Sequence, residues 1–298
     1  MSPPAGLSPD AEGFLADLAQ RGRAANTVAA YRRDLATYER FLHGRGLSVP
    51  QAGEDDVAAY VAALTAAGRK PASVARAVVV LRALHRWCGS DAAVEVATPE
   101  PDRADPSVLT EAEAAALVGS PRGNSAVARR DRALLEVLYA TGARISEVVG
   151  LCLGDVAGGV ARLGGPRPRV VPYGRPAADA IEVWTARGGR DAMAGPGRAG
   201  PSDALFLNQR GGRLSRQWGW SVVRHHGEQV GMAGRLAPHV LRHSFAVHLA
   251  GRGAPAAVVQ QLLVGLPDVL SLDELVEGYR RWHPRALRTT SQGRPHSY

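Results

Sequence analysis

Three short stretches of the sequence combine arginine, histidine and tyrosine in ways that suit the binding and attack of a phosphate. TGARISE contains Arg144, and PHVLRHSFAVHLA contains His239 and Arg242, which share one face of a helix because they are three residues apart. Arginine presents a planar fork of donors to two phosphate oxygens, and histidine can donate a hydrogen bond or relay a proton. EGYRRWHPRAL contains Tyr279, and the two arginines that follow it favour the phenolate form that a nucleophile needs.

Each stretch taken alone also fits a purely structural role. Arg144 and Glu147 have the three-residue spacing of an ion pair on a helix surface. His239 fits a structural histidine with satisfied hydrogen bonds, and Tyr279 fits a surface aromatic. The other two histidines of the second stretch are expected to pack against their neighbours or to support them.

Helices are the elements expected to position all three stretches. Thr110, followed by acidic residues, predicts a helix start, and ARRDRALLEVLYATG predicts a helix that ends just before Arg144. GGVARL and RVVPY are strand candidates with GGPRP as their hairpin turn, and LFLN is a third short candidate. Further helices are predicted from about residue 215 to 281, with breaks at glycines near residues 231–234, 251–253 and 265–267.

The first hundred residues predict a bundle of four or five helices. Asn26 is the predicted N-cap of a helix whose apolar residues recur at steps of three and four, and Pro71 is the predicted start of a later one. Residues 96–108 carry three prolines and no periodicity, which is typical of a linker. We therefore predict an N-terminal domain at residues 1–95 and a second domain at residues 109–298.

Charge is distributed unevenly along this chain of 298 residues. The net charge is +8, but residues 1–102 carry −1 and residues 103–298 carry +9. A basic second half favours a polyanionic partner, which means nucleic acid or a membrane surface. Two cysteines exclude a disulfide framework and a cysteine-rich zinc site, and no segment approaches the roughly 20 apolar residues that span a bilayer. We expect a soluble cytoplasmic protein without a secretory signal.

In order along the chain, Arg144, then His239 and Arg242, then Tyr279 resemble the catalytic series of the tyrosine recombinases, the family of phage integrases and Xer-type recombinases. LLEVLYATGARISEVVGLCLGDV is very similar to the family segment that carries its first catalytic arginine. NTVAAYRRDLATYERFL, RVVPYGRPAADAI, LFLNQRGGRLSRQ and YRRWHPRAL match further family blocks. The resemblance implies a mainly α fold, with a helical SAM-like core-binding domain followed by a mostly helical catalytic domain with a small antiparallel sheet.

The resemblance also implies a mechanism. Arg144 and Arg242 would clamp the scissile phosphate, His239 would assist proton movement, and Tyr279 would attack phosphorus to leave a 3′-phosphotyrosyl link. That link conserves the energy of the phosphodiester, so neither ATP nor a metal nor another cofactor is expected. Glu147 would support the arginine region. Double-stranded DNA is the implied partner, bound by a clamp of two domains and by a homo-tetramer or hetero-tetramer in which residues 270–298 dock onto a neighbouring protomer.

Two positions depart from the family pattern. The family places a lysine in the hairpin to protonate the leaving oxygen, but Gly164 stands there and the only lysine, Lys70, is in the other domain. Arg162 or Arg167 could reach the site, although arginine hardly releases a proton. Gly265 stands where the family has a histidine or tryptophan that contacts the phosphate, with His283 as a partial substitute.

Three functions follow from this pattern. The first is a site-specific DNA recombinase or integrase. The second is a degenerate family member that binds DNA or a recombinase partner without efficient strand exchange, and the third is a helical DNA-binding regulator without phosphoryl chemistry. Neither the DNA target nor the choice between chromosome-dimer resolution and phage, plasmid or transposon mobility follows from the sequence, because a few unidentified side chains read the bases.

Overall fold

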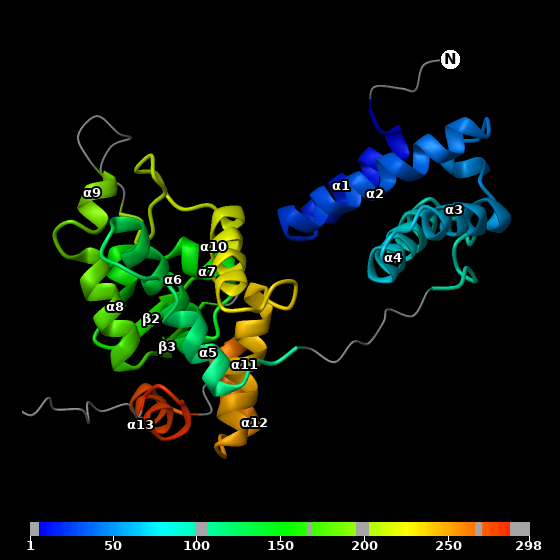
Figure 1. The fold of residues 1–298 in the computed structure, drawn as a ribbon. Helices are drawn as coiled ribbons and strands as arrows, with labels where there is room; N and C mark the ends of the chain where they lie inside the picture. Colours follow the sequence, from blue (N-terminus) through cyan, green and yellow to red (C-terminus); the bar gives the residue numbers. More distant parts are fainter. Residues whose placement is uncertain (1–5, 99–106, 166–167, 195–202, 266–269, 287–298) are drawn as a thin grey trace, which may run out of the picture. The chain divides into compact units, whose positions relative to one another are not determined.

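The computed structural model describes residues 6–98, 107–165, 168–194, 203–265 and 270–286. The chain divides into two units, residues 1–104 and 105–298, which we call unit 1 and unit 2. Each is mostly helical, and the only sheet among the described residues lies in unit 2 (Figure 1). Of the predicted linker at residues 96–108, residues 99–106 lie outside the described part.

Unit 1 is a bundle of four α-helices with one 3₁₀ turn in its described residues. The helices pack around a core that includes Leu35, Tyr38, Leu81 and Leu84. The second helix begins at Ala25 after an extended Ala24, so the predicted N-cap, Asn26, lies inside the first turn instead. The elements are α1 (Pro9–Gln20), α2 (Ala25–Gly44), η1 (Val49–Gln51), α3 (Glu54–Ala66) and α4 (Pro71–Trp87).

Unit 1 also carries a basic cavity, although its sequence is nearly neutral. The cavity has a volume of about 430 Å³ and is bordered by α2, α3 and α4. Four arginines contribute to its lining: Arg33, Arg40, Arg69 and Arg76. Asp34, which accepts a hydrogen bond from Arg76, also lines the cavity, so the lining carries three more positive than negative side chains, whereas residues 1–102 as a whole carry −1.

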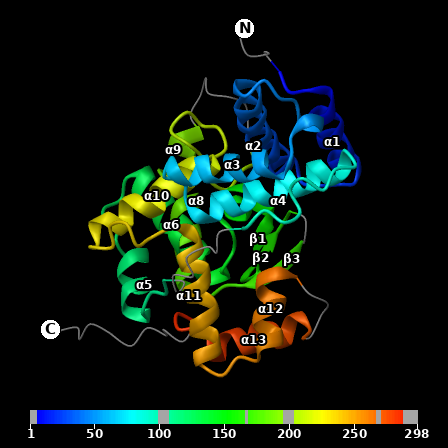
Figure 2. The ribbon, with the colours of Figure 1, turned by 90° about the vertical axis from the view of Figure 1, so that its right-hand side faces the viewer.

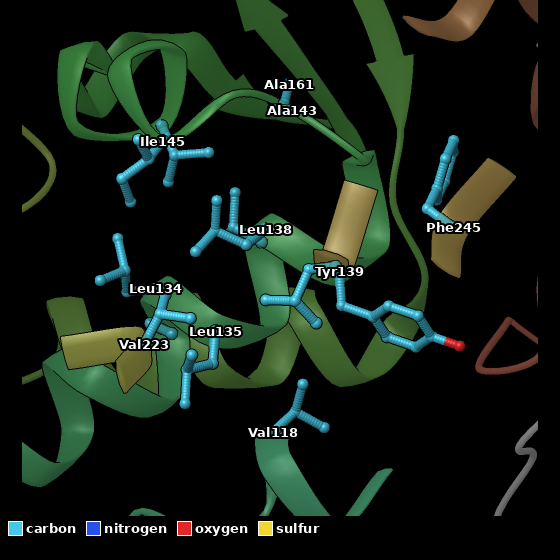
Figure 3. Packing of buried hydrophobic residues seen from close by; sticks show 14 of the residues in the cluster. Val118, Leu134, Leu135, Leu138, Tyr139, Ala143, Ile145, Ala161, Val223 and Phe245 are labelled. Carbon is cyan, nitrogen blue, oxygen red and sulfur yellow. The ribbon is translucent and has the colours of Figure 1, made fainter. Parts of the chain in front are cut away.

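Unit 2 surrounds a central helix, α6 (Ala126–Thr141), whose C-terminal half is buried on all sides. Leu134 and Leu138 of this helix lie near Val223 and Ile145, which belong to two other helices (Figure 3). The other helices are α5 (Glu111–Val118), α7 (Ile145–Gly150), α8 (Arg175–Thr185), α9 (Arg190–Ala194), α10 (Arg216–Gln229), α11 (Pro238–Gly251), α12 (Ala256–Val264) and α13 (Leu272–Trp282).

The sheet of unit 2 has three antiparallel strands in the order β1-β2-β3: β1 (Val156–Ala157), β2 (Val160–Leu163) and β3 (Arg169–Pro172). Leu163 pairs with Arg169 at the hairpin end, and the turn beyond them includes residues 166–167, which lie outside the described part. The predicted strands at β2 and β3 are confirmed. The strand predicted at LFLN is wrong, because Leu207 forms only an isolated bridge with Arg213.

None of the described helices combines the length and the apolar character that crossing a membrane requires.

Candidate active site

The turn between α6 and α7 brings the candidate site together. Gly142 ends α6 in the left-handed region, with φ of +58°. A Cβ at this position would overlap the ring of Phe245 on α11, lying 2.8 Å from its Cγ. Only glycine meets both the backbone and the packing requirement, so the chain turns sharply after α6 and α7 starts three residues later, at Ile145.

Arg144 is the N-cap of α7 and is held there by Glu147. Its backbone N–H donates to Oε2 of Glu147 at 2.6 Å, and its guanidinium donates to Oε1 at 3.1 Å. The Arg144 side chain is 53% exposed, whereas that of Glu147 is 8% exposed. Glu147 therefore supports the arginine from inside and leaves most of the guanidinium open to a ligand.

Glu147 stays ionised because of its partners. Burial by itself would raise the pKa of this carboxyl group, but hydrogen bonds from Arg169 and from the Arg144 amide outweigh burial and hold the pKa below its usual range. Arg169 donates to both oxygens of Glu147, at 2.8 and 3.0 Å, and its Nε donates to the carbonyl of Leu262 at 2.7 Å. Sequence reasoning missed Arg169, although an arginine at the start of an otherwise apolar strand was a usable signal.

Arg242 reaches the same turn from α11. It donates to the carbonyl oxygens of Gly142 at 2.8 Å and Leu263 at 2.7 Å. Burial, together with the nearby charges of Arg144 and Arg169, lowers the pKa of Arg242 to about 10. The guanidinium is still charged at neutral pH, and an anion that relieves its repulsion with the other arginines is favoured at this position.

His239 lies one turn before Arg242 on α11 and is exposed. Its ring centroid is 5.9 Å from that of His243, which is also exposed. His248 on the same helix is buried instead, between the Tyr139 hydroxyl and the Leu109 carbonyl, each at 2.8 Å, as its expected packing role requires. The structure thus places Arg144 and Arg242 at one turn, with an accessible histidine on the helix that carries Arg242.

Tyr279 occupies a different environment. Its side chain is buried on α13, which packs against β3 and α11 (Figure 2). Its hydroxyl donates to the carbonyl of Ala140 at 2.9 Å, and its ring stacks on His283 with a centroid distance of 4.6 Å and an interplanar angle of 8°. Among the described residues, the Tyr279 hydroxyl is hydrogen-bonded to Ala140 and not to the guanidinium group of Arg144 or Arg242.

The expected activation of Tyr279 by neighbouring arginines is wrong for this structure. Burial raises the pKa of the Tyr279 phenol well above 10, and Glu136 and Arg285 are the charged side chains with the largest influence on it. Arg280 and Arg281 are exposed, and Arg280 pairs with Glu277 at 3.4 Å. The hydroxyl is therefore held in its neutral form where it lies.

The two positions predicted to depart from the family pattern, Gly164 and Gly265, lie in different surroundings. Gly164 follows β2, is exposed, and a Cβ on it would have no neighbour within 4 Å. Gly265 caps α12 with φ of +64°, a conformation that a histidine adopts only with strain. Neither glycine carries a functional group, and their correspondence to the lysine and histidine of the family stays a prediction.

Two of the three residues predicted as substitutes, Arg162 and His283, have partners or surroundings of their own. Arg162 donates a long hydrogen bond of 3.4 Å to the carbonyl of Gly154, and Arg167 lies outside the described residues. His283 is fully buried, and this burial lowers its pKa to about 3, so its ring is neutral at pH 7. Across the described part of the chain, no three His, Cys, Asp or Glu side chains are grouped so as to hold a metal ion.

Both units match known protein families. Residues 107–264 match the phage integrase family, and residues 11–90 match the N-terminal SAM-like domain of phage integrases. The chain belongs to the phage integrase family. The family match to unit 2 includes Arg144, His239 and Arg242 and ends before Tyr279.

Relatives at high coverage make the assignment more specific. The tyrosine recombinase XerD of Mycobacterium leprae is 39% identical over 95% of this chain and 99% of its own length. XerD of Mycobacterium tuberculosis is 40% identical over 92% of this chain and 97% of its own length. Among solved structures, the Tn1549 transposon integrase in complex with circular intermediate DNA has a TM-score of 0.68 at 17% identity, and the alignment covers 94% of this chain and 97% of that one.

These relatives identify the chain as a site-specific tyrosine recombinase. The predicted family, the mainly α fold and the recombinase function are confirmed. The comparisons support neither the degenerate family member nor the helical DNA-binding regulator without phosphoryl chemistry. The roles of individual residues remain predictions.

Proposed function

We propose that this recombinase cuts and rejoins DNA with Arg144, His239, Arg242 and Tyr279 as its catalytic residues. Residues 109–298 would form the catalytic domain and residues 1–95 the DNA-binding domain. The observation that carries the proposal is the pair of arginines at the Gly142 turn, one largely exposed and the other with its pKa lowered by neighbouring cations. Glu147 is the carboxylate that pairs with Arg144, but it is shared with Arg169, so three guanidinium groups face one carboxylate and a scissile phosphate would supply a second anion.

The proposed reaction is a transfer of the phosphodiester from DNA to tyrosine and back. Arg144 and Arg242 would stabilise the charge that develops on the non-bridging oxygens, and His239 would donate to the same phosphate. Tyr279 Oη would lose its proton and bond to phosphorus while the bond to the 5′ oxygen breaks, and that oxygen would gain a proton. Unit 2 contains no lysine to supply this proton, and loss of a general acid slows such a step by about 10²–10⁴-fold.

Tyr279 can take this role only after it leaves its buried position. The hydroxyl would have to exchange the Ala140 carbonyl for water or DNA, and the ion pair between Arg285 and Glu136 would have to open as α13 moves. We propose that DNA or a partner protomer provides the contacts that favour this release. Residues 287–298, the end of the segment predicted to dock onto a neighbour, lie outside the described residues.

The proposed partner is double-stranded DNA, bound by a tetramer of identical or related recombinases. The support for DNA is the charge of +9 on residues 103–298 and the family. Among solved structures of similar fold are the Tn1549 transposon integrase in complex with circular intermediate DNA and a XerH site-specific recombinase bound to its difH substrate. A DNA substrate implies a cytoplasmic location. The mass of the complex on DNA, measured by sedimentation, tests the assembly: a complex that stays monomeric at every concentration contradicts it.

Two observations favour a second candidate function. Because the Tyr279 hydroxyl is buried and unit 2 has no lysine, the chain could bind DNA beside a catalytically complete recombinase and leave the chemistry to that partner. This candidate requires the fold and the arginine pair but no covalent step.

A nicked suicide substrate separates the two candidates. Active chain should form a covalent protein–DNA adduct that Tyr279→Phe abolishes. Tyr139→Phe is the matched control, because Tyr139 is also buried in unit 2 with a hydroxyl that is hydrogen-bonded, to His248 at 2.8 Å. No adduct with the wild-type chain, alone or with a partner recombinase, favours the second candidate, and an adduct that persists in Tyr279→Phe assigns the nucleophile to another residue.

A further inference from the structure

Arg169 connects the supports of both site arginines. Its guanidinium donates to both oxygens of Glu147, the carboxylate that holds the amide and the side chain of Arg144. Its Nε donates to the carbonyl of Leu262 at 2.7 Å. The next carbonyl along the chain, that of Leu263, accepts from Arg242 at 2.7 Å. One residue thus links the anchor of Arg144 to the anchor of Arg242.

The C-terminal end of α12 suits this task for a physical reason. The last four carbonyl groups of a helix have no partners within it and carry partial negative charge. Leu262 and Leu263 belong to that last turn, which ends at the left-handed Gly265. Two guanidinium groups from β3 and α11 therefore complete the end of α12, and their positions are fixed relative to each other by adjacent peptide units.

We propose that Arg169 is a positioning residue that sets the spacing of Arg144 and Arg242 around a phosphate, an inference that rests on the proposed function. Arg169 does not touch the phosphate itself, because its side chain is only 4% exposed and is fully engaged by Glu147 and Leu262. It keeps Glu147 charged and oriented and joins it to α12. Without Arg169, Arg144 would keep its charge and exposure but would lose its fixed position.

The alternative is that Arg169 only neutralises a buried carboxylate. Arg169→Met alone does not separate the two roles, since it leaves Glu147 buried and unpaired and destabilises the fold. The double variant Arg169→Met with Glu147→Gln removes both charges, and neutral replacement of a buried ion pair is often tolerated. Glu147→Gln keeps an oxygen that can accept from the Arg144 amide. If Arg169 is only a counter-ion, the double variant should therefore recover both stability and the position of Arg144, whereas a positioning role predicts a stable protein with a displaced Arg144.

The readout is the salt dependence of affinity for a short DNA duplex of arbitrary sequence, which needs no cleavage. Each neutralised phosphate contributes about 0.9 to the slope of log affinity against log salt concentration. Arg144→Gln should reduce the magnitude of this slope by about 0.9, the contribution of one phosphate contact. The double variant should melt close to the wild-type temperature and show the same loss of slope. Arg169→Lys, which keeps the charge but not the two-pronged contact, should lie between it and the wild type.

The matched control is another buried arginine–carboxylate pair of unit 2. Nη2 of Arg130 and Oδ1 of Asp131 are 2.7 Å apart, and the two side chains are 7% and 8% exposed. Their further hydrogen bonds join them to Leu207 and His226, not to the site arginines. Arg130→Met with Asp131→Asn should leave the slope unchanged. A wild-type slope in the Arg169 double variant, or in Arg144→Gln, overturns the proposal. If the slopes behave as expected but no covalent adduct ever forms, the proposed chemistry fails while the positioning role of Arg169 stands.

Discussion

The hydroxyl of Tyr279 donates a hydrogen bond of 2.9 Å to the carbonyl oxygen of Ala140, in the last turn of α6. Two residues further on, the carbonyl of Gly142 accepts from Arg242 at 2.8 Å. The proposed nucleophile and a proposed phosphate-binding arginine are thus fixed to neighbouring carbonyls of one turn. Docking of α13 buries the Tyr279 hydroxyl against this turn. The hydroxyl therefore becomes accessible only when α13 moves.

Weakening the docking of α13 should increase covalent reactivity. Glu136→Gln removes the buried carboxylate that pairs with Arg285, so α13 should detach more readily. The rate of adduct formation on a nicked suicide substrate is expected to rise, while the free energy of unfolding falls. Arg280→Gln is the control, because it breaks only the exposed pair with Glu277 on the same helix and should change neither quantity. An adduct rate that falls in step with stability would show that release of α13 is not required.

Gly142 should be intolerant of any side chain. Gly142→Ala combines a left-handed backbone with an overlap against Phe245, and we expect a loss of more than about 2 kcal/mol in the free energy of unfolding. Gly158→Ala is the matched control: its φ of +61° imposes the same strain, but a Cβ there has no neighbour within 4 Å. Its cost should stay near 1 kcal/mol. Equal costs, measured by urea denaturation, would mean that the contact with Phe245 is unimportant.

Local sequence patterns were sufficient for the arginine part of the site. The helix pattern ending in Thr-Gly placed Arg144 at the start of the next helix, and the three-residue spacing placed His239 and Arg242 on one helical face. Both features depend on periodicity and glycine conformation, which neighbouring residues encode. The strands at β2 and β3 were also predictable, whereas β1 has only two residues and carries no alternation.

The environments of Tyr279 and Arg169 were not predictable in this way. Tyr279 lies in a helix with charged neighbours. Its burial follows from the packing of α13 on β3 and α11 and from the contact of its hydroxyl with Ala140 of α6, which is 139 residues earlier in the sequence. Arg169 starts a strand, and its side chain points into the interior because it is hydrogen-bonded there to Glu147 of α7 and Leu262 of α12. A charged residue becomes stable in the interior only through such distant partners, and those are tertiary information.

The stability of unit 2 should fall in mild acid because of His283. Burial lowers the pKa of His283 to about 3 from its ordinary value of 6.5, so between these values the unfolded chain binds a proton that the folded chain does not. Its contribution is complete above pH 6.5 and declines as the pH falls toward 3, by up to about 1.4 kcal/mol per pH unit. His283→Leu should therefore have a shallower dependence of unfolding free energy on pH than the wild type.

The control for this prediction is His243→Gln, which removes an exposed imidazole from the same unit and should leave the pH dependence unchanged. Burial also lowers the pKa of His85 in unit 1. Because His85 is present in every variant, it does not affect the difference in pH dependence between His283→Leu and the wild type. Denaturation at pH 7 and pH 5 is the measurement. Parallel curves for His283→Leu and the wild type would exclude a neutral buried His283.

Restoring a proton donor at Gly164 should accelerate cleavage. Gly164 is exposed, its backbone is outside the left-handed region, and open space surrounds its missing Cβ, so Gly164→Lys should fold normally. A lysine ammonium can protonate the leaving 5′ oxygen, and we expect adduct formation on the suicide substrate to rise by about 10²-fold or more. Gly164→Arg is the matched control: it adds the same charge and a similar length, but its guanidinium hardly releases a proton. A faster rate of adduct formation in Gly164→Lys alone identifies the missing group as a general acid. Equal gains in Gly164→Lys and Gly164→Arg would mean that the added positive charge acts only by strengthening the affinity for DNA.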